Sequence, residues 1–348
     1  RNLHIIMNED GEYNPSLGYP CKKECGLCHD VCPFGNDRLN EYVIGESLFG
    51  LVPGIQHDQI VGHYLSSFAG HVSSDARRVQ SASGGITTWL LCDLLKRREI
   101  DAVICVSPTN GVDPLFQYIV ARDVESIESS TGSVYYPVQL SDVLSYIRDT
   151  PGRYAITALP CFAKGIRLAQ AKNKALRERI VYVIGLTCGQ IKNKRYTDYL
   201  AALAGLEGNV STAFFRGKEK NTPASNYTFL CSNERGKVRK LHWDEGVSEA
   251  WSDRLFTLNP CNYCDDIFAE CADIVFMDAW LPEYIDDWRG TNIVIVRSRK
   301  LLGAIDDGVQ RDEVGITPLS IDKVVQSQSG AIAFKRQLLR TRLWLAER

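Results

Sequence analysis

The chain has 348 residues, 45% of them hydrophobic and 24% charged, which is the composition of a globular protein with a sizeable core. Its 40 basic and 42 acidic residues give a net charge of −2, so a broad nucleic-acid-binding surface is not expected. The mean hydropathy is −0.16 and no apolar run reaches about 18 residues, so no membrane span is expected either.

Cysteine is the unusual component, with 12 residues. The first residues, RNLHIIMNEDGEY, carry too short an apolar run for a secretion signal, and we expect a cytoplasmic protein. Cysteines in such a chain are more often metal ligands or redox groups than a disulfide framework. Three of them fall inside regular elements and are expected to pack there: Cys92, Cys105 and Cys231.

The regular elements begin near residue 81, after a first stretch that looks irregular. Apolar residues at helical spacing predict helices, and short apolar runs predict buried strands. In chain order these are a helix at 86–99, strands at 101–107 and 154–159, a helix at 162–179, a strand at 180–188 and a helix at 192–205. Strands that alternate with helices predict an α/β fold with a mainly parallel, mixed sheet.

The pattern changes after residue 208. Two short runs around NERGK predict a β-hairpin at 226–243, and further buried strands are expected at 272–280 and 291–297. Residues 334–348 resemble a basic amphipathic helix. Its arginines are expected to face solvent, with a partner subunit or an electron donor as the alternatives: Arg336, Arg340, Arg342 and Arg348.

Four cysteines stand close together near the N-terminus: Cys21, Cys25, Cys28 and Cys32, in the pattern C-x3-C-x2-C-x3-C-P. Thiolates are soft ligands that suit iron–sulfur clusters and zinc. The spacing is similar to bacterial ferredoxin motifs, apart from one extra residue in the first gap. Structural zinc sites usually show two separated pairs, so one 4Fe-4S cluster held by all four is favoured over zinc, disulfides or free thiols.

A second set of cysteines is scattered along the chain. Cys261 and Cys264 form a C-x2-C pair that needs two more ligands. Cys161 and Cys188 follow predicted strands, and in an open α/β sheet the carboxyl ends of the strands border the ligand-binding crevice. These four are candidates for a second 4Fe-4S cluster, with Cys271 as a rival to Cys161. The alternative is that Cys161 and Cys188 are small buried hydrophobic residues.

Two turns rich in glycine and serine could bind a phosphate-bearing cofactor. SASGG at 81–85 precedes the helix at 86–99, whose N-terminus offers free N–H groups. STGSVYY at 130–136 adds a second turn followed by two tyrosines. Ordinary helix capping and core packing would explain either turn by itself. Neither a G-x-G-x-x-G fingerprint nor a P-loop is present.

Taken together, seven stretches resemble the coenzyme F420 hydrogenase/dehydrogenase beta-subunit family, which includes 7-hydroxymethyl chlorophyll a reductase. They follow the family's order: CKKECGLCHDVCP, SASGGITTWLL, GSVYYPV, ALPCFAKGIR, GLTCG, CNYCDDIFAECADIVFMDAW and GTNIVIVR. The chain departs from the family at Phe162, where glutamine is frequent, and at Cys271, an extra thiol.

The resemblance implies a flavoprotein, usually with FAD, that carries one or more 4Fe-4S clusters. The positions matching flavin-contacting stretches are Ser81, Ser83, Gly84, Gly85, Thr87, Ser133 and Tyr135. The positions matching ligands of the cluster beside the flavin are Cys161, Cys188, Cys261 and Cys264, and the N-terminal cysteines match a ferredoxin-like cluster. We therefore expect an iron–sulfur segment at 1–80, a flavin-binding α/β domain with a second cluster at 81–300, and a helical segment at 301–348.

The implied activity is that of an oxidoreductase that passes electrons from ferredoxin or a similar one-electron donor, through two 4Fe-4S clusters and FAD, to a small-molecule acceptor. A proton donor is also needed, and His242, Asp278 and Tyr135 are candidates, although each is more often a structural residue. The alternatives are an electron-relay beta subunit of a hydrogenase or dehydrogenase complex, an F420 oxidoreductase, and a structural zinc protein. No nucleic-acid or membrane partner is expected, and a homo-oligomer is compatible with the sequence.

Overall fold

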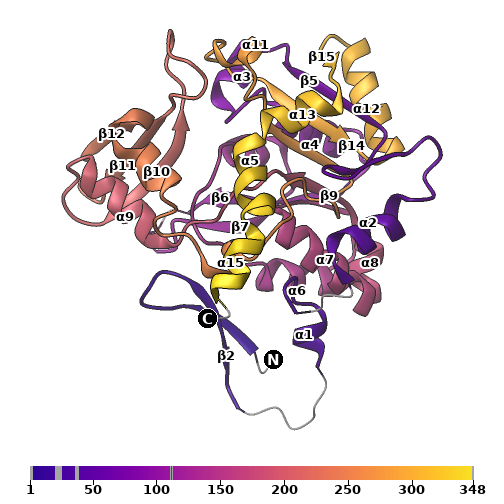
Figure 1. Ribbon diagram of the computed structural model, residues 1–348, viewed down its shortest axis with the longest axis horizontal. Helices are drawn as coiled ribbons and strands as arrows, with labels where there is room; N and C mark the ends of the chain where they lie inside the picture. Colours follow the sequence, from indigo (N-terminus) through magenta and orange to yellow (C-terminus); the bar gives the residue numbers. More distant parts are fainter. Residues whose placement is uncertain (1–2, 20–25, 36–38, 110, 112, 347–348) are drawn as a thin grey trace.

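Eight strands form a central sheet in the order β15-β5-β14-β13-β9-β8-β6-β7 (Figure 1). The structure is a computed structural model that describes residues 3–19, 26–35, 39–109, 111 and 113–346. The strands of this sheet are β5 (Ser66–Val72), β6 (Ala102–Pro108), β7 (Phe116–Ala121), β8 (Tyr154–Ala158), β9 (Ile180–Leu186), β13 (Ile274–Asp278), β14 (Asn292–Val296) and β15 (Val314–Pro318).

The middle of the sheet is parallel and its margins are antiparallel. β13, β9, β8 and β6 pair in parallel, whereas β14, β5, β15 and β7 join through antiparallel ladders. The expected α/β fold class with a mainly parallel mixed sheet is therefore confirmed. Its parallel strands are buried on both faces, which explains their almost continuous apolar sequences.

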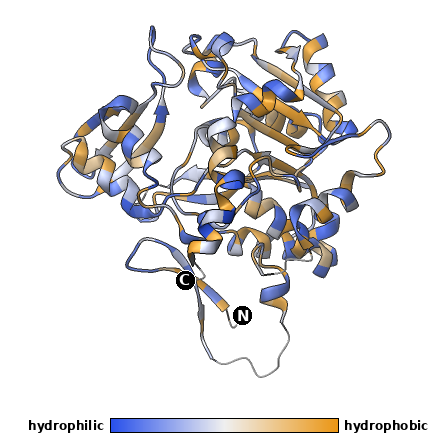
Figure 2. Cartoon of the chain, in the orientation of Figure 1, coloured by the Kyte–Doolittle hydropathy of each residue, from blue (hydrophilic) through white to orange (hydrophobic). Residues whose placement is uncertain are grey.

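Helices cover both faces of the sheet, and the hydrophobic strands stand out in the centre of Figure 2. Because side chains alternate along a strand, Val103 and Cys105 of β6 point to one core while Ala102 and Ile104 point to the other. One core is closed by α4 (Ile86–Lys96), α5 (Val124–Ser129) and α12 (Arg299–Gln310). The other is closed by α6 (Ser141–Asp149), α7 (Pro160–Lys172), α8 (Lys174–Arg179), α13 (Ile321–Ser327) and α14 (Ser329–Ile332).

A smaller lobe stands at the side of the sheet (Figure 1). A three-stranded antiparallel sheet and helix α9 share a third core with aromatic residues such as Phe116 and Tyr136. The lobe consists of α9 (Lys194–Leu203), β10 (Val210–Gly217), β11 (Thr228–Asn233) and β12 (Val238–His242). Strand β10 was not among the sequence predictions, which expected only the hairpin that became β11 and β12.

Shorter elements occupy the two ends of the chain and the long connections. Before β5 come α1 (Leu27–Asp30), α2 (Glu41–Phe49), and the hairpins β1 (Leu3–Met7)/β2 (Tyr13–Leu17) and β3 (Gln56–Asp58)/β4 (Gly62–Tyr64), and α3 (Asp75–Gln80) follows β5. After β12 come η2 (Trp243–Val247), α10 (Ser248–Ser252), η3 (Asn259–Asn262) and α11 (Pro282–Ile285). The chain ends with the π-helix η4 (Ala333–Gln337) and α15 (Leu339–Ala346).

The expected segment boundaries at 80 and 301 do not coincide with units of this fold. β5 lies before residue 80 and β15 after residue 301, yet both pair within the central sheet. The helix expected at 162–179 is two helices, because the chain is extended at Asn173, whose side chain caps α8. The three cysteines expected to pack in regular elements are buried: Cys92, Cys105 and Cys231.

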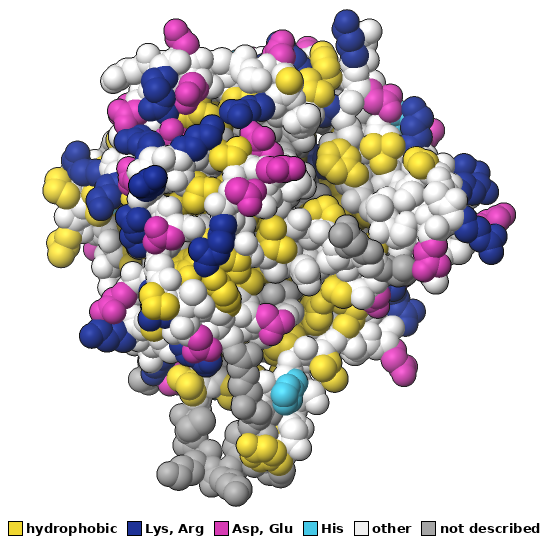
Figure 3. Space-filling view, turned by 180° about the vertical axis from the view of Figure 1, so that it is seen from behind, with side chains coloured by type: hydrophobic (Ala, Val, Ile, Leu, Met, Phe, Trp, Pro, Cys, Tyr) yellow, Lys and Arg dark blue, Asp and Glu magenta, His cyan; other side chains and the backbone are white. Residues whose placement is uncertain are grey.

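The part of the chain that the structure describes contains no helix that combines the length and apolar character needed to cross a bilayer. Side chains of both charges are interspersed over the face seen in Figure 3, in keeping with the balanced composition.

Arg297 ties the sheet to the segment that follows the C-x2-C pair. Its side chain is fully buried at the end of β14 and donates five hydrogen bonds, all to backbone carbonyl oxygens. Three of the acceptors lie in the segment after Cys264: Phe268, Ala269 and Ala272. The other two belong to Val61 and His63.

Replacing Arg297 by methionine should destabilise the fold severely, because five buried carbonyls lose their donor. We expect Arg297→Met to lower the free energy of unfolding by about 3–5 kcal/mol in denaturant titrations. Arg148 is the control, since it forms an exposed ion pair with Asp149, and Arg148→Met should change stability by no more than about 0.5 kcal/mol. Equal effects of the two substitutions would show that the Arg297 contacts contribute little.

Candidate redox site at the carboxyl edge of the sheet

The candidate residues gather along one edge of the central sheet. The ladders make β5, β13, β9, β8 and β6 run in the same direction, so their carboxyl ends share an edge. The SASGG turn follows β5, Cys161 follows β8, Cys188 follows β9, and Asp278 ends β13. This edge is where open α/β sheets bind their ligands.

Local structure fixes each cysteine of the scattered set. Cys161 occupies the first turn of α7, directly after Pro160. The N–H of Cys188 donates to Ile267 O at 3.3 Å, which attaches the end of β9 to the segment after the C-x2-C pair. Cys261 lies in η3, and its Sγ accepts the N–H of Ile191 at 3.4 Å.

The thiols of this set are partly buried and close enough to influence one another. Burial raises the pKa of Cys161, and the charges of Cys188, Cys264 and Cys261 raise it further. Burial likewise raises the pKa of Cys188 to about 12, with contributions in the same direction from Cys261 and Cys264. Burial and mutual repulsion oppose the ionisation of these four thiols. They would therefore become thiolates only next to compensating positive charge.

The chain supplies that positive charge. Lys335, from η4, is buried and donates to Cys188 O at 3.2 Å. The pKa of Lys335 is raised, because the charges of Cys188 and Cys264 outweigh the burial that would lower it. Arg254 faces the same thiols, and its Nε and Nη2 are buried without a hydrogen-bond partner among the described residues. Unpartnered buried donors beside thiols indicate room for an anionic group.

Cys271 is not part of this arrangement. Its side chain is fully buried in the core beneath α7, with its Sγ 3.9 Å from Glu41 O. Burial raises its pKa, and the charge of Asp266 raises it further. The geometry therefore favours Cys161 over Cys271 as the companion of Cys188, Cys261 and Cys264.

The scattered set offers four partly buried thiols as ligands. Among the residues that the structure describes, no three His, Cys, Asp or Glu side chains converge closely enough to hold one metal ion. Thiolates are the ligands that iron–sulfur clusters take, so the chemistry of the four residues fits a cluster.

The N-terminal cysteines are described only in part. Cys21 and Cys25 lie outside the described residues, Cys28 is exposed on α1, and Cys32 follows α1 and is partly buried. This segment rests on α7. Asp30 pairs with Lys172 at 2.8 Å, and a Cβ on Gly165 would stand 3.7 Å from Val31 O. One helix therefore carries Cys161 in its first turn and the N-terminal segment further along.

The local backbone structure explains why both residues at the end of the SASGG turn are glycines. A Cβ on Gly84 would lie 2.5 Å from Gly70 O, so only glycine allows this backbone approach to β5. Gly85 caps α4 with a φ of 86°. The side chain of Asn292 already accepts the N–H of Ile86 at 3.1 Å. The serine hydroxyls donate to backbone oxygens, Ser81 to Arg77 and Ser83 to Thr291.

A small cavity of about 10 Å³ lies beside this turn. Arg216 enters it from β10 and pairs with Asp278 at 2.6 Å, with its guanidinium 4.8 Å from the ring centre of Tyr227 and 5.3 Å from that of Trp280. The Nε of Arg216 is buried and has no partner in the described chain. The cavity is lined by both signs of charge and by aromatic rings, among them Ala82, Arg216, Lys218, Tyr227, Asp278 and Trp280.

Lys218 fastens the turn to the small lobe. Its Nζ donates to the carbonyl oxygens of Arg78 and Ser83, each at 2.7 Å, and to that of Arg289. Burial lowers the pKa of Lys218 to about 7, and the charge of Arg216 lowers it too.

A second small cavity, of about 20 Å³, borders the same turn. Ser81 and Gly85 line it together with Thr88 and Thr131. Tyr135, four residues after Thr131, belongs to the first cavity's surroundings. Burial raises its pKa, Arg216 opposes this shift, and Asp278 and Ser133 also act on it. The turn 81–85 lines both cavities, and Thr131 of the turn 130–136 lines the second. Thr87 is partly exposed at the start of α4.

The three proton-donor candidates separate in space. Asp278 and Tyr135 meet at Arg216, whereas His242 lies next to Glu219, 3.8 Å away, on the small lobe. Sequence reasoning missed Arg216, Lys218, Tyr227 and Trp280. Arg216 lies near the end of β10 and Lys218 directly follows this strand, which was not predicted, so their common location was not visible in advance.

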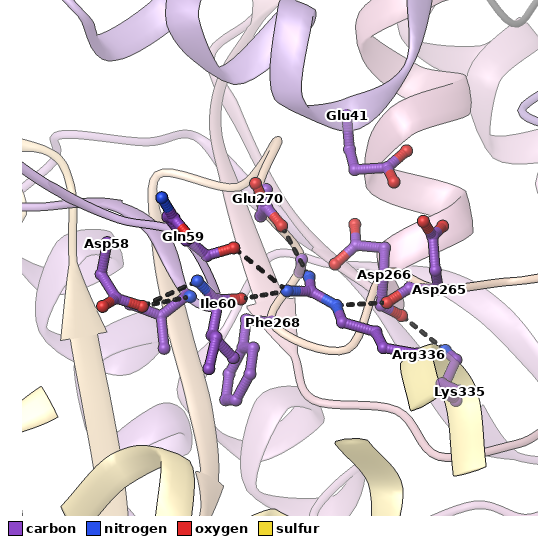
Figure 4. A network of polar contacts seen from close by, with 12 residues as sticks. Glu41, Asp58, Gln59, Ile60, Asp265, Asp266, Phe268, Glu270, Lys335 and Arg336 are labelled. Atoms are coloured by element: carbon purple, nitrogen blue, oxygen red, sulfur yellow. Dashed lines mark hydrogen bonds and ion pairs between the residues drawn. The ribbon is translucent and has the colours of Figure 1, made fainter. Parts of the chain in front are cut away.

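Two of the C-terminal arginines, Arg336 and Arg342, bind the rest of the chain rather than facing solvent, which corrects the expected solvated face at these positions. Figure 4 shows Arg336 bound to the carbonyl oxygens of Ile60 and Asp265, at 2.8 and 3.1 Å, and to Glu270 at 2.9 Å. Arg342 donates to Asn262 O, between the two cysteines of the C-x2-C pair. Of the others, Arg340 is exposed and Arg348 lies outside the described residues.

Comparisons with known proteins agree with this geometry. The family model described as coenzyme F420 hydrogenase/dehydrogenase, beta subunit N-term, matches residues 67–145, and the corresponding C-terminus model matches residues 152–321. No curated protein matches the chain.

Among solved structures, one similar chain is from a xenon-derivatised F420-reducing NiFe hydrogenase complex of Methanosarcina barkeri. The TM-score is 0.61 at 18% identity, over 82% of this chain and 95% of that one, which shows a shared fold. The two family models together span the sheet edge that carries the cysteines and both cavities. The chain belongs to the coenzyme F420 hydrogenase/dehydrogenase beta-subunit family, a family of oxidoreductase subunits.

Proposed function

We propose that this chain is an iron–sulfur flavoprotein that takes single electrons from ferredoxin or a similar donor and delivers them in pairs to a small-molecule acceptor. The observation that carries the proposal is the set Cys161, Cys188, Cys261 and Cys264, held together beside Lys335 and Arg254. When bound, two 4Fe-4S clusters would supply one-electron carriers, and FAD would supply hydride exchange.

The four thiols and their cations form the part of the chain that would hold the second cluster. The thiolates would bind its iron, and the cluster with four thiolates would be an anion. Lys335 and Arg254 would neutralise part of that charge in a partly buried site, where an unpaired charge is expensive. Because Lys335 also binds the backbone at Cys188 and Asp266, it holds the end of β9 to the C-x2-C segment.

The N-terminal segment is suited to receive electrons from outside. Cys28 is exposed and Cys32 partly so, and the segment rests on α7, which carries Cys161 in its first turn. A donor that docks at this segment would therefore approach the molecule on the side of α7. We assign all four N-terminal cysteines to this first cluster.

The flavin is assigned to the turns 81–85 and 130–136 and the two cavities beside them. Buried donors without partners border the first cavity at Arg216 and near it at Arg78, and both would find acceptors in a polar cofactor or acceptor. Arg216 and Asp278 would orient the acceptor, and Tyr135 lies where it could hold or release the proton that accompanies two electrons. A cytoplasmic location fits such redox chemistry.

A relay subunit without its own substrate is the second candidate. Exposed apolar side chains support a docking function: Ile6 is 52% exposed on β1, Leu17 56% on β2 and Leu345 59% on α15. The similar hydrogenase structure is a complex. A stable complex with another subunit would favour a relay, whereas a monomer or homo-oligomer that reduces a soluble acceptor, F420 included, would favour an enzyme.

The first prediction concerns iron. Protein purified without oxygen should contain about eight iron atoms and about one flavin per chain. Cys188→Ser should leave about four iron atoms, because one of the two clusters loses a ligand, while Cys271→Ser should keep all of them. Colorimetric iron and sulfide assays with visible spectra make the measurement. Stoichiometric zinc without iron would contradict the proposal. Loss of iron from Cys271→Ser, with iron retained in Cys161→Ser, would make Cys271 rather than Cys161 the fourth ligand.

The second prediction concerns the entry of electrons. Replacing the N-terminal cysteines together (Cys21→Ser, Cys25→Ser, Cys28→Ser and Cys32→Ser) should remove about half of the iron and leave the flavin bound. Reduction of the flavin by reduced ferredoxin should then slow by at least about a hundredfold, since the one-electron entry point is lost. Reduction by dithionite, a small donor, is the control. Unchanged ferredoxin-driven reduction would exclude this segment as the entry point.

The third prediction concerns the flavin pocket. Lys218→Met should weaken flavin binding at least about tenfold, or about 1.4 kcal/mol, because the SASGG turn loses its anchor to β10. Lys220, exposed two residues later, provides the matched control, and Lys220→Met should bind flavin like the wild type. Fluorescence titration of the apoprotein with FAD and with FMN measures both affinities. Equal Kd values for the two variants would remove the turn from the flavin site.

A further inference from the structure

Arg254 carries two buried donors that the described chain leaves without an acceptor. Its Nε and Nη2 are shielded from solvent, and neither forms a hydrogen bond. Folded proteins rarely leave such groups unpaired, least of all on a charged side chain. The guanidinium is therefore directed at an acceptor that the polypeptide itself does not provide.

The neighbours of Arg254 identify the kind of acceptor. Burial lowers its pKa, and the charges that oppose this effect come from Cys261, Cys188 and Cys264. Arg254 thus faces three of the four thiols assigned to the second cluster. Two other cations interact with it: Arg342 donates to the backbone of Asn262 and Phe334, although its Nη2 is also buried without a partner in the described chain, and Lys192 donates to the backbone of Ala250 and Leu255.

The backbone at position 254 would accommodate glycine more easily than arginine, so the presence of arginine points to a role for its side chain. Its φ is 57°, in the left-handed region that glycine normally occupies after a helix. The N–H of Arg254 donates to Trp251 O and that of Leu255 to Ala250 O, both at 3.1 Å, which closes the end of α10. An arginine at this position strains the backbone where a glycine would not.

The side chain is also held in place. The guanidinium lies 3.6 Å from the ring centre of Phe334, and that of Arg342 lies 4.0 Å from the same ring. Stacking on an aromatic ring fixes the plane of a guanidinium while its edge keeps its N–H donors for other partners. Phe334 precedes Lys335 in η4, so the C-terminal segment places both cations at the thiols.

We propose that Arg254 donates its Nε–H and Nη2–H to sulfur atoms of the second cluster and thereby raises the reduction potential of that cluster. The inference rests on the proposed 4Fe-4S cluster at Cys161, Cys188, Cys261 and Cys264. Reduction adds one electron to an already anionic group, so N–H donors and a fixed positive charge stabilise the reduced form more than the oxidised form. Arg254 is a cofactor-contacting residue in this account and takes no part in proton transfer.

The test is a redox titration of the complete holoprotein, followed by electron paramagnetic resonance so that the two clusters are resolved. Arg254→Met keeps a side chain that can pack on Phe334 but removes the charge and both donors. We expect the second cluster to be about tenfold more oxidised at the wild-type midpoint, which is a fall of about 59 mV for a one-electron couple. Arg254→Lys keeps the charge without the planar pair of donors and should fall in between.

Arg235→Met removes the same charge from the exposed β11–β12 turn and should leave both potentials unchanged. Iron assays and thermal unfolding of the holo- and apoproteins accompany each titration. Loss of the second cluster from Arg254→Met also supports direct contact, provided that its apoprotein melts like the wild-type apoprotein.

Two results would overturn the inference: an unchanged potential in either Arg254 variant with iron retained, or an apoprotein destabilised as much as the holoprotein. Wild-type protein without iron at the four cysteines would instead refute the proposed function itself, and the two failures are therefore distinguishable.

Discussion

Charge compensation around four partly buried thiols is the constraint on which the rest of the structure depends. Burial and mutual repulsion raise the pKa of Cys161 and Cys188, so the thiolate forms need cations close by. Lys335 and Arg254 come from segments far apart in the chain, the π-helix η4 and the end of α10. The C-terminus is therefore part of the site, although the family models end at residue 321.

The same edge of the sheet also explains why two candidate cofactor sites lie next to each other. β5 and β13 carry the SASGG turn and Asp278, while β8 and β9 carry two of the thiols, and the strands are near neighbours in the sheet. Two buried cations hold loops at opposite edges of the sheet. Lys218 binds the turn after β5, and Arg297 binds the segment after the C-x2-C pair. Both bind backbone carbonyl oxygens. They therefore fix the conformations of the loops without occupying the functional side chains of the site.

Much of the centre could be predicted from sequence, since buried parallel strands such as β8 and β9 are continuous apolar runs bounded by helices. The expectation that Cys161 and Cys188 lie at the same edge of the sheet followed from the direction of their strands alone. Other features depend on contacts between distant segments. β10 lacks a distinctive pattern, so Arg216 and Lys218 were not recognised, and two of the expected solvated arginines of the C-terminal helix bind the C-x2-C segment instead. Orphaned donors such as those of Arg254 are invisible in a sequence, because they are defined by the absence of a three-dimensional partner.

The central claim is that four thiols from three separate regions share one inorganic cluster. Crystals grown without oxygen and measured on both sides of the iron absorption edge would test it most directly. The account predicts an anomalous iron signal in contact with the sulfur atoms of Cys161, Cys188, Cys261 and Cys264, with Arg254 directed at it. Iron ligated by Cys271 in place of Cys161, or the four thiols without iron and too far apart to share a cofactor, would contradict it.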